Sequence, residues 1–412
     1  MQPHLNSLGG LPRQGQTSSS VRSANLAMVL REVVEGAGSP SRAEVANRLG
    51  MTRSTVSRLV DELIDGGLVA EGDAIAGPRG RPAVPLAPAA DSVVALGIEV
   101  NVDKICLAVV DLAGNVIDAD TTMTDNTALE ASQVLDEVAR LVRGVCDRLE
   151  EWTTLVGIHL AIPGLVDREG RTILRAPNLK WDGVVPADHV TELLEGLGTR
   201  FRVGNDIDAS GLTVIEEFRG AGDDWASFIY ITGEVGVGAA VILDRQLMTG
   251  RHGWASELGH VCVDPDGDVC GCGARGCLET VAGLPAVLRA TGCRDLPEVL
   301  GRLRAGDERA LHALRTVGRA VGQALSAAMN LLDVGNVVLG GYLAECAPWL
   351  TDDLLAEVRT RVLWGSYSPI EVTTVDDAPS RTARGAAMAS LAHIVADPAA
   401  WLDARQAGTT SV

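Results

Sequence analysis

The chain has 412 residues, of which 46% are hydrophobic and 22% are charged. This length allows two or three domains, and this composition excludes an intrinsically disordered chain. The formal net charge of -19 argues against a nucleic-acid partner for the chain as a whole. Residues 21–90 are an exception, because their eight arginines balance their eight acidic residues. A local DNA-binding face is therefore compatible with the composition.

The start of the chain carries no targeting pattern. Residues 1–20 are polar and rich in glycine and serine, and we expect them to form a disordered tail. They lack the basic-then-apolar order of a signal peptide, and no later apolar run is long enough to span a membrane. We therefore expect a cytoplasmic protein without a membrane partner.

Three helices are predicted next. Residues 21–36 place their apolar side chains on one helical stripe. The second helix, residues 41–50, begins with Ser41 and Glu44 at the spacing of a capping box. The third helix, residues 51–67, ends at a pair of glycines. The side chains expected to face the core are Val56, Leu59, Val60, Leu63 and Ile64.

Short helices followed by a hairpin are typical of a winged helix-turn-helix, which we assign to residues 21–90. The third helix would enter the major groove, and residues 68–86 would form the wing. Arginine, serine and threonine can contact base edges and phosphates, which predicts DNA contacts by Arg53, Ser54, Thr55, Ser57, Arg58, Arg79 and Arg81. The alternative is a three-helix protein-interaction module with a solvated arginine- and serine-rich face.

A Pro/Ala-rich connector at residues 82–92 precedes a change of pattern. Strands are predicted at 93–100, 105–112, 155–164 and 226–233, and helices at 130–150, 205–219, 281–293 and 308–332. Such alternation predicts an α/β core with a mixed sheet, in two lobes. We assign the first lobe to residues 91–204, the second to 205–385, and a C-terminal helix and tail to 386–412.

Three closely spaced cysteines follow a histidine in the second lobe. One imidazole and three thiolates suit a structural zinc ion with no open position, which predicts the ligands His260, Cys270, Cys272 and Cys277. Disulfides are one alternative, disfavoured in the cytoplasm. The other is unligated buried cysteine, which fits the remaining five: Cys106, Cys146, Cys262, Cys293 and Cys346.

With these residues assembled, the chain resembles the ROK family of repressors, open reading frames and kinases. The resemblance rests on Gly-His followed by a Cys-x-Cys-Gly-x-x-Gly-Cys-x-Glu element. It also rests on AIPGLVD (161–167), APNLKW (176–181), GNDIDASGLTVIEE (204–217) and VVLGGYL (337–343), all in family order. It implies an actin-like, hexokinase-like two-lobed core, and together with the winged helix-turn-helix a sugar-responsive regulator.

The resemblance also implies a sugar site. The contacts carried over by position are Asn178, Asn205, Asp206, Glu257, His260 and Glu279. Amide and carboxylate groups can form paired hydrogen bonds with neighbouring sugar hydroxyls. In this interpretation His260 binds zinc through one ring nitrogen and faces the sugar with the other. Each residue also has a structural alternative, such as a helix cap for Asn205 or an ion pair for Glu279.

Catalysis is a separate question, because Asp206 corresponds to the general base of the family's kinases. The first phosphate loop of those kinases, DIGGTK, is replaced here by residues 99–104, without its glycines and with Asp103 in place of the threonine. The second, GTGIGGG, is replaced by residues 234–240, which begin with a glutamate. Tyr342 stands where a small residue is usual near the adenine. These changes predict lost nucleotide binding.

The expected protein is therefore a sugar-sensing transcriptional repressor and not an enzyme. A homodimer or dimer of dimers would hold operator DNA, and a sugar or sugar phosphate would close the lobes and weaken DNA binding. One rival is a bifunctional ATP-dependent sugar kinase. The other is a constitutive DNA-binding or protein-docking module with an inert core that binds no sugar.

Overall fold

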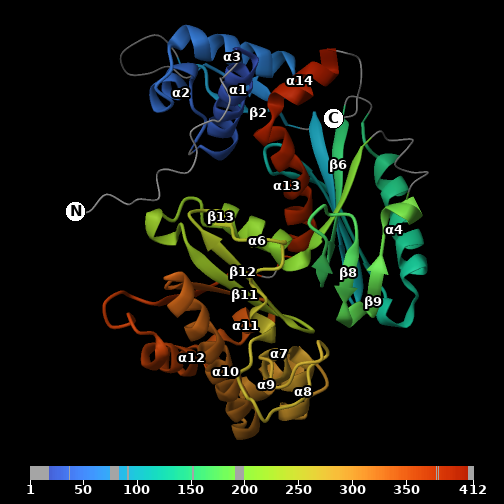
Figure 1. Ribbon diagram of the computed structural model, residues 1–412, viewed down its shortest axis with the longest axis vertical. Helices are drawn as coiled ribbons and strands as arrows, with labels where there is room; N and C mark the ends of the chain where they lie inside the picture. Colours follow the sequence, from blue (N-terminus) through green and yellow to red (C-terminus); the bar gives the residue numbers. More distant parts are fainter. Residues whose placement is uncertain are drawn as a thin grey trace.

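The computed structural model describes residues 18–36, 38–74, 83–90, 92–150, 153–190, 199–376, 378 and 380–406. Within these residues a helical N-terminal domain lies above two lobes, each built on a five-stranded sheet (Figure 1). No helix in the described ranges is long and apolar enough to cross a membrane. The N-terminal elements are α1 (Ser18–Glu35), α2 (Arg42–Arg48), α3 (Arg53–Asp65), β1 (Val69–Glu71) and β2 (Leu86–Pro88).

The predicted caps of the N-terminal domain are confirmed. The Ser41 hydroxyl accepts a hydrogen bond from the Glu44 backbone N–H, and the Glu44 carboxylate accepts one from the Ser41 N–H at 2.7 Å. Of the side chains expected to face inward from α3, four are fully buried, and Ile64 is half-buried. The predicted tail is wrong at its end, because α1 begins at Ser18; serine is favoured at helix starts as well as in disordered chain.

A short hairpin follows α3 where the wing is predicted. Strands β1 and β2 pair antiparallel, with Ala70 opposite Ala87. The tip of the wing, with the predicted DNA contacts Arg79 and Arg81, falls in residues 75–82, outside the described residues.

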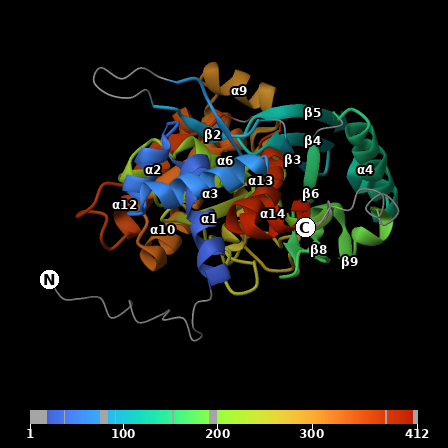
Figure 2. The ribbon, with the colours of Figure 1, turned by 90° about the horizontal axis from the view of Figure 1, so that it is seen from above.

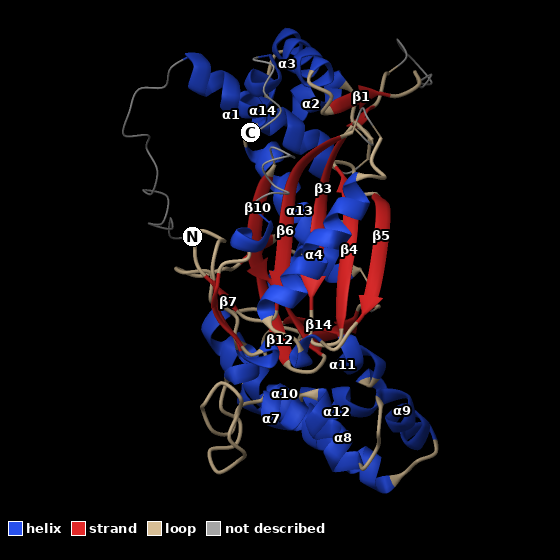
Figure 3. Ribbon diagram, turned by 90° about the vertical axis from the view of Figure 1, so that its right-hand side faces the viewer, coloured by secondary structure: helices blue, strands red, loops and turns tan. Residues whose placement is uncertain are grey.

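The first lobe has a sheet of strand order β10-β6-β3-β4-β5. Strand β3 runs parallel to β6 and antiparallel to β4. Helix α4 covers one face and α13 the other (Figure 3). The elements are β3 (Val93–Val100), β4 (Lys104–Asp111), β5 (Val116–Met123), α4 (Ala131–Cys146), β6 (Thr154–Ile162) and β10 (Arg200–Asn205), with a small sheet of β7 (Leu165–Val166), β8 (Ile173–Ala176) and β9 (Trp181–Val184).

The second lobe repeats this plan. Its sheet has the order β13-β12-β11-β14-β15, with β11 antiparallel to β12 and parallel to β14. The strands are β11 (Phe228–Gly233), β12 (Val237–Leu243), β13 (Gln246–Leu247), β14 (Asn336–Gly340) and β15 (Glu371–Thr374). Because both sheets place antiparallel strands on one side of the central strand and parallel strands on the other, the lobes are two copies of one topology.

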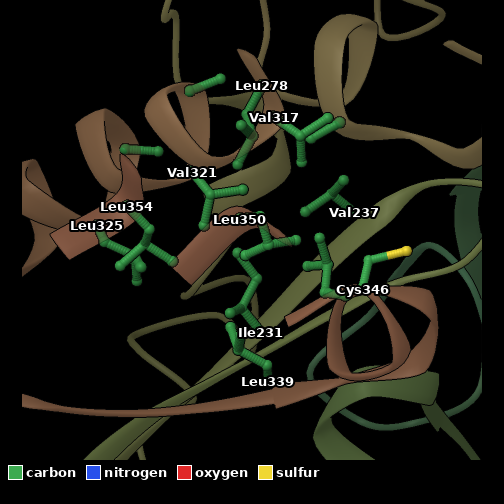
Figure 4. Packing of buried hydrophobic residues seen from close by; sticks show 14 of the residues in the cluster. Ile231, Val237, Leu278, Val317, Val321, Leu325, Leu339, Cys346, Leu350 and Leu354 are labelled. Atoms are coloured by element: carbon green, nitrogen blue, oxygen red, sulfur yellow. The ribbon is translucent and has the colours of Figure 1, made fainter. Parts of the chain in front are cut away.

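Helices complete the second lobe. Its apolar core joins Ile231 and Leu339 of the sheet to Val321 and Leu350 of the long helices (Figure 4). The predicted helix 281–293 is divided at Gly283, because a proline in the next helix favours a new start. The helices are α6 (Asp206–Glu217), α7 (Glu279–Ala282), α8 (Leu284–Thr291), α9 (Leu296–Arg304), α10 (Glu308–Leu332), α11 (Gly341–Glu345) and α12 (Ala347–Arg361).

Helices α6 and α13 (Arg381–Ala396) cross between the lobes. They approach so closely that a Cβ at Gly385 would lie 1.8 Å from the Ala209 carbonyl oxygen. The buried hydroxyls of Ser210 and Thr382 are 2.9 Å apart across the same contact. Close packing and buried hydrogen bonds make these helices one rigid pair.

The last helix, α14 (Pro398–Gln406), returns to the N-terminal domain and lies beside α1 and α3 (Figure 2). The Trp401 indole N–H and the Arg405 guanidinium both donate to the Gly66 carbonyl oxygen, at 3.1 and 3.0 Å. Leu402 packs where a Cβ at Gly66 would be. The C-terminal segment, predicted as one helix and a tail from residue 386, is thus two helices, because α13 begins earlier, at Arg381, and a proline after it starts α14.

Candidate sugar cavity and cysteine cluster

A cavity of ≈ 210 Å³ opens between the two lobes. Its wall combines the end of β10, the start of α6 and the turn from β11 to β12. The volume is below the range of about 300–1,000 Å³ for drug-sized ligands, and it suits a smaller molecule. All six predicted sugar contacts line this cavity: Asn178, Asn205, Asp206, Glu257, His260 and Glu279.

The backbone places the two asparagines in different ways. Asn178 is in a one-turn 3-10 helix, Pro177–Leu179, which ends at Lys180 in a left-handed conformation with φ 60°. Asn205 caps α6, since its Oδ1 accepts hydrogen bonds from the N–H groups of the second and third residues that follow it. Its Nδ2 donates to the Gly164 carbonyl oxygen at 3.1 Å. Asn205 therefore has the structural role considered from the sequence, and ligand contact by it stays a prediction.

Asp206 is the first residue of α6 and is 7% exposed. Its Oδ1 accepts a hydrogen bond from the Ile207 N–H at 2.9 Å. Burial raises the pKa of this carboxyl well above its usual range, and the nearby Glu234 and Glu99 raise it further. A carboxyl in this state can act as donor or acceptor to a ligand hydroxyl.

An amide joins the two acidic residues behind Asp206. The Asn101 side-chain nitrogen donates to Glu99 Oε1 at 3.2 Å and to Glu234 Oε2 at 2.9 Å. Glu99 lies near the end of β3 and Asn101 directly follows that strand, whereas Glu234 follows β11 of the second lobe, so this contact links the lobes. Burial raises the pKa of Glu99 to about 7, with Glu234 adding to the effect and the Lys104 ammonium opposing it.

The predicted metal ligands gather into one cluster. The ligand atoms of His260, Cys270, Cys272 and Cys277 all lie within 4.8 Å of one another. The Cys270 sulfur is 3.7 Å from His260 Nδ1, and the sulfurs of Cys272 and Cys277 are 3.7 Å apart. A tetrahedral zinc ion with bonds of about 2.3 Å would place its sulfurs roughly 3.8 Å apart. The spacing fits this metal and is too long for a disulfide.

Turn geometry and charge both support a metal at this cluster. Gly276 has φ 73°, and a Cβ there would lie 1.6 Å from the Asp264 carbonyl oxygen, so only glycine allows the turn. Burial, together with the neighbouring thiols, raises the pKa of Cys277 to about 12. A bound cation would favour the thiolate form of Cys277. The expectation of burial is wrong for two of the other five cysteines, because Cys262 is exposed on the same loop and Cys146, at the end of α4, is half-buried.

The two glutamates that flank the cysteines connect the cluster to the cavity. Glu279 Oε2 accepts from the Val237 N–H at 3.3 Å, and its Oε1 is 3.7 Å from the Cys270 sulfur. Burial raises the pKa of Glu257. The nearby His260 lowers this pKa, and the nearby Glu279 raises it. Because His260 turns Nδ1 to the cysteines, its other ring nitrogen is left for the cavity that it lines.

The predicted recognition helix carries its polar side chains outward. Arg53, Ser54 and Arg58 are exposed, and Thr55 and Ser57 are half-buried. Arg58 pairs with Glu62 at 3.3 Å. The Arg42 guanidinium of α2 supports this helix by donating to the Ser57 carbonyl oxygen at 3.0 Å and to the Asp61 carboxylate. The hydroxyl of the N-cap residue, Thr52, hydrogen-bonds the Thr55 hydroxyl at 2.8 Å. The DNA contacts predicted for this helix remain Arg53, Ser54, Thr55, Ser57 and Arg58.

Comparisons with known proteins decide the family. The sequence pattern of the ROK family matches residues 95–393. The chain belongs to the ROK family. A MarR family pattern matches residues 27–76, which contain α2 and α3. The fold is therefore a helix-turn-helix domain followed by the α/β core that this family shares with sugar kinases.

Two transcriptional regulators are similar to this ROK protein along most of its length. The xylose repressor of Bacillus subtilis (strain 168) is 26% identical over 87% of this chain and 94% of its own. The transcriptional dual regulator NagC of Escherichia coli (strain K12) is 27% identical over 83% and 86%. A solved structure, a ROK family transcriptional regulator homologous to the E. coli MLC protein, matches the fold with a TM-score of 0.75 and 23% identity, covering 93% of this chain and 99% of that one.

The two loops at residues 99–104 and 234–240 have several of their backbone N–H groups paired within the protein. The Glu234 N–H donates to the Gly236 carbonyl oxygen at 2.9 Å, and the Val237 N–H donates to Glu279. In the first loop the Asn101 N–H donates to the Lys104 carbonyl oxygen at 3.0 Å, and the Val102 N–H donates to the Asn101 side chain. Backbone N–H groups of the kind that cradle phosphates are therefore already paired here.

Sequence reasoning missed one residue that lines the cavity and one titratable residue close to it. Arg175 of β8 lines the cavity and is exposed. Arg175 stands two residues before Pro177, which begins the turn that carries Asn178. This closeness to a predicted sugar contact is the signal that could have placed Arg175 at the cavity. Burial and the nearby Glu257 raise the pKa of Asp208 to about 7. That side chain follows Asp206 by two positions, where the sequence indicates only a helix start.

The buried carboxyls make stability depend on pH. Glu99 binds its proton more tightly in the folded state, so its contribution to stability is full below about pH 4.5 and is lost as the pH rises towards 7. We expect Glu99→Gln to raise the free energy of unfolding at pH 8 by ~2 kcal/mol and to change it little at pH 4.5. Urea unfolding at both pH values measures this, with exposed Glu371→Gln as the control; an equal effect at both values would contradict it.

Proposed function

We propose that this ROK protein is a sugar-responsive repressor of carbohydrate metabolism genes. The observation that carries the proposal is one cavity lined by all six predicted sugar contacts. One of them, Asp206, begins α6, and α6 is connected through α13 and α14 to the DNA-binding domain. The names of the xylose repressor and NagC support the same class. A repressor acts on DNA, so the proposed location is the cytoplasm.

Sugar recognition rests on the polar groups of the cavity. Asn178 presents an amide, and Glu257 and Glu279 present carboxylates from opposite ends of the cysteine loop. A sugar that lacks one of the matched hydroxyls would leave such a group unpaired, which gives the site its selectivity. Asp206 would contact a hydroxyl of the sugar without acting as a general base, since we propose that the chain does not bind a nucleotide.

We assign the four-residue cluster to a structural zinc ion held by His260, Cys270, Cys272 and Cys277. Four protein ligands leave no position for water, so the ion would close the loop and supply no catalytic chemistry. Glu279 follows Cys277 by two residues and lines the cavity, so closing the loop would fix the carboxylate that faces the sugar.

DNA binding is assigned to α3 and the wing. A homodimer or dimer of dimers would present two copies of α3 to successive major grooves of a pseudo-palindromic operator. The exposed side chains of α3 support this face. The sites on the wing, Arg79 and Arg81, remain predictions from the sequence.

Arg53 tests the DNA-binding face. Its exposed guanidinium stands at the first position of α3, where a recognition helix meets base edges. We expect Arg53→Ala to weaken operator binding by about 10–100-fold, the loss of one base contact. Fluorescence anisotropy with a labelled operator measures this at fixed salt. Arg31→Ala, an exposed change on α1, is the control and is expected to leave affinity within about twofold; equal effects of both would contradict the assignment.

The route from cavity to DNA runs through three helices. Asp206 begins α6, α6 packs rigidly on α13, and α14 continues from α13 to the end of α3. We propose that a sugar draws the lobes together and that the α6–α13 pair moves with them. Helix α14 would then shift the DNA-binding domains, so that the spacing of the two recognition helices no longer fits the operator. The sugar must bind the closed form more tightly than the open form for this to occur.

Catalysis as a sugar kinase is the second candidate, favoured by the fold and by the placement of Asp206. Three features oppose it. Several N–H groups of the two loops are already paired within the protein, and Glu234 adds a negative charge where a polyphosphate would lie. Tyr342 is 3% exposed and packs against Gly233. We therefore propose that the chain binds sugar without transferring phosphate.

Titration of a sugar panel against an operator complex tests the proposal. One sugar is expected to weaken operator binding at least fivefold, within the usual range of coupling between sites. The same sugar should raise the melting temperature while ATP with magnesium does not. ATP turnover with any sugar would favour the kinase, and a panel in which no sugar binds would favour a constitutive module.

A further inference from the structure

The DNA-binding domain shares an apolar core with the first lobe. Leu30 of α1 and Leu63 of α3 belong to the same buried cluster as Ala95 of β3 and Leu391 of α13. Trp401 of α14 lies in this cluster as well. Because packed interiors are stiff, a continuous core of this kind anchors the DNA-binding domain to the first lobe.

Helix α6 connects the sugar cavity to the sheet of the second lobe. Asp206 and Ile207, in its first turn, line the cavity. At its other end Val214 and Phe218 pack with Phe228 of β11, and the Phe218 and Phe228 ring centroids are 5.5 Å apart. A helix rises 1.5 Å per residue, so these two ends are about 18 Å apart. A shift of the cavity wall at the first turn would therefore move the far end as well.

Arg219, directly after the C-cap of α6, contacts the DNA-binding domain. Its Nη1 donates to the Val34 carbonyl oxygen of α1 at 3.4 Å, and its Nη2 pairs with Glu216 Oε2 at 2.5 Å. The Arg219 side chain is 30% exposed, so these contacts are partly shielded from water. Glu216 is on the last turn of α6, and it holds the guanidinium so that Arg219 moves with this helix.

The end of α1 is suited to receive a cation. Val34 is among the last four residues of α1, whose carbonyl groups lack partners within a helix and carry the negative end of its dipole. This last turn has no basic residue of its own. Its Glu32 pairs with Arg48 of α2 at 2.7 Å, and α2 holds α3 through Arg42. Polar contacts thus lead from α6 to the recognition helix.

We propose that Arg219 is a positioning residue that ties the DNA-binding domain to the second lobe, so that the domain is held by both lobes. This inference rests on the proposed function. The apolar core fixes one side of the domain to the first lobe, and Arg219 fixes the end of α1 to α6. A change in the angle between the lobes would then tilt α1, and α2 and α3 with it. A domain held by the first lobe alone would keep its position on that lobe.

Replacement of Arg219 by methionine tests the inference in the full chain. Arg219→Met keeps a long unbranched side chain and removes the charge and the donors. The probe is whichever of glucose, mannose, xylose and N-acetylglucosamine raises the melting temperature of the parent. We expect this sugar to bind the variant with unchanged affinity by isothermal titration. By fluorescence anisotropy we expect it to alter operator affinity by less than about twofold, against at least fivefold in the parent.

Arg302→Met is the matched control. Arg302 donates to the carbonyl oxygen of Thr291, at the end of α8, at 3.2 Å and pairs with Glu298 of its own helix at 2.8 Å. This is the arrangement of Arg219, but both partners are in the second lobe, so the response to sugar should remain at least fivefold.

The outcomes separate the inference from the proposed function. An Arg219→Met protein that responds as the parent does, or a loss of response equal in both variants, would overturn the role of Arg219 and leave the proposed function intact. Loss of sugar binding in Arg219→Met would also overturn it, because the residue would then support the cavity. A parent whose operator affinity is changed by no sugar would overturn the proposed function, and the inference with it.

Discussion

Replacement of Cys270 by serine is expected to release the proposed zinc ion and to weaken sugar binding by at least roughly 100-fold. The Cys270 sulfur lies 3.7 Å from both His260 Nδ1 and Glu279 Oε1, so one atom connects the metal cluster to two residues of the cavity wall. Without it the loop between Glu257 and Glu279 loses its closure, and both carboxylates lose their fixed positions. The expected effect is large because several ligand contacts fail together.

Two measurements separate this effect from general unfolding. Elemental analysis of protein purified under reducing conditions gives zinc per chain, and isothermal titration gives the affinity for the sugar. Circular dichroism and operator binding report whether the rest of the chain is folded. Cys262→Ser is the matched control, because Cys262 is exposed on the same loop and is not in the cluster. A Cys270→Ser protein that binds sugar as tightly as the parent would refute the role of the cluster.

Removal of the contacts between α14 and α3 is expected to separate sugar binding from DNA release. Trp401 and Arg405 both donate to the carbonyl oxygen of Gly66, the residue that ends α3. Trp401→Phe together with Arg405→Ala removes both donors while an aromatic ring remains in the buried position. We expect the sugar to bind the double variant with unchanged affinity and to alter operator affinity by less than about twofold, against at least fivefold in the parent.

A variant on the same helix provides the control. Asp403→Asn removes only an exposed pair with Arg22 at 3.8 Å, which contributes little at a surface, so the response should remain. Operator affinity with and without sugar, measured by fluorescence anisotropy for all three proteins, gives the comparison. A double variant that still releases DNA on sugar binding would exclude α14 as the route. Loss of sugar binding in it would show that the contact supports the cavity itself.

Much of the N-terminal domain was predictable because its signals are local. Ser41 and Glu44 form the capping box that their spacing indicates, and the apolar stripe of α3 is buried. The cysteine cluster was also predictable, since tight turns and thiol chemistry operate within eighteen residues of chain, His260 to Cys277. These features depend on neighbours that the sequence itself places together.

Other features depended on packing between distant segments. The bond from Trp401 to Gly66 joins residues 335 positions apart, and the bond from Asn101 to Glu234 joins residues 133 apart across the lobes. No local spacing encodes either contact, because each is formed only after two sheets and a crossing pair of helices have assembled. The exposure of Cys262 and the place of Arg175 on the cavity wall were decided in the same way.

The amino-acid sequence by itself determined the family, the caps, the cluster of one histidine and three cysteines, and the polar residues of the cavity, because residue type and short spacing specify local chemistry. The tertiary structure decided how these parts are connected. It placed the start of α6 in the cavity, packed that helix on α13, and returned α14 to the end of α3. Long-range packing creates that connection, and a linear pattern of side chains does not record it.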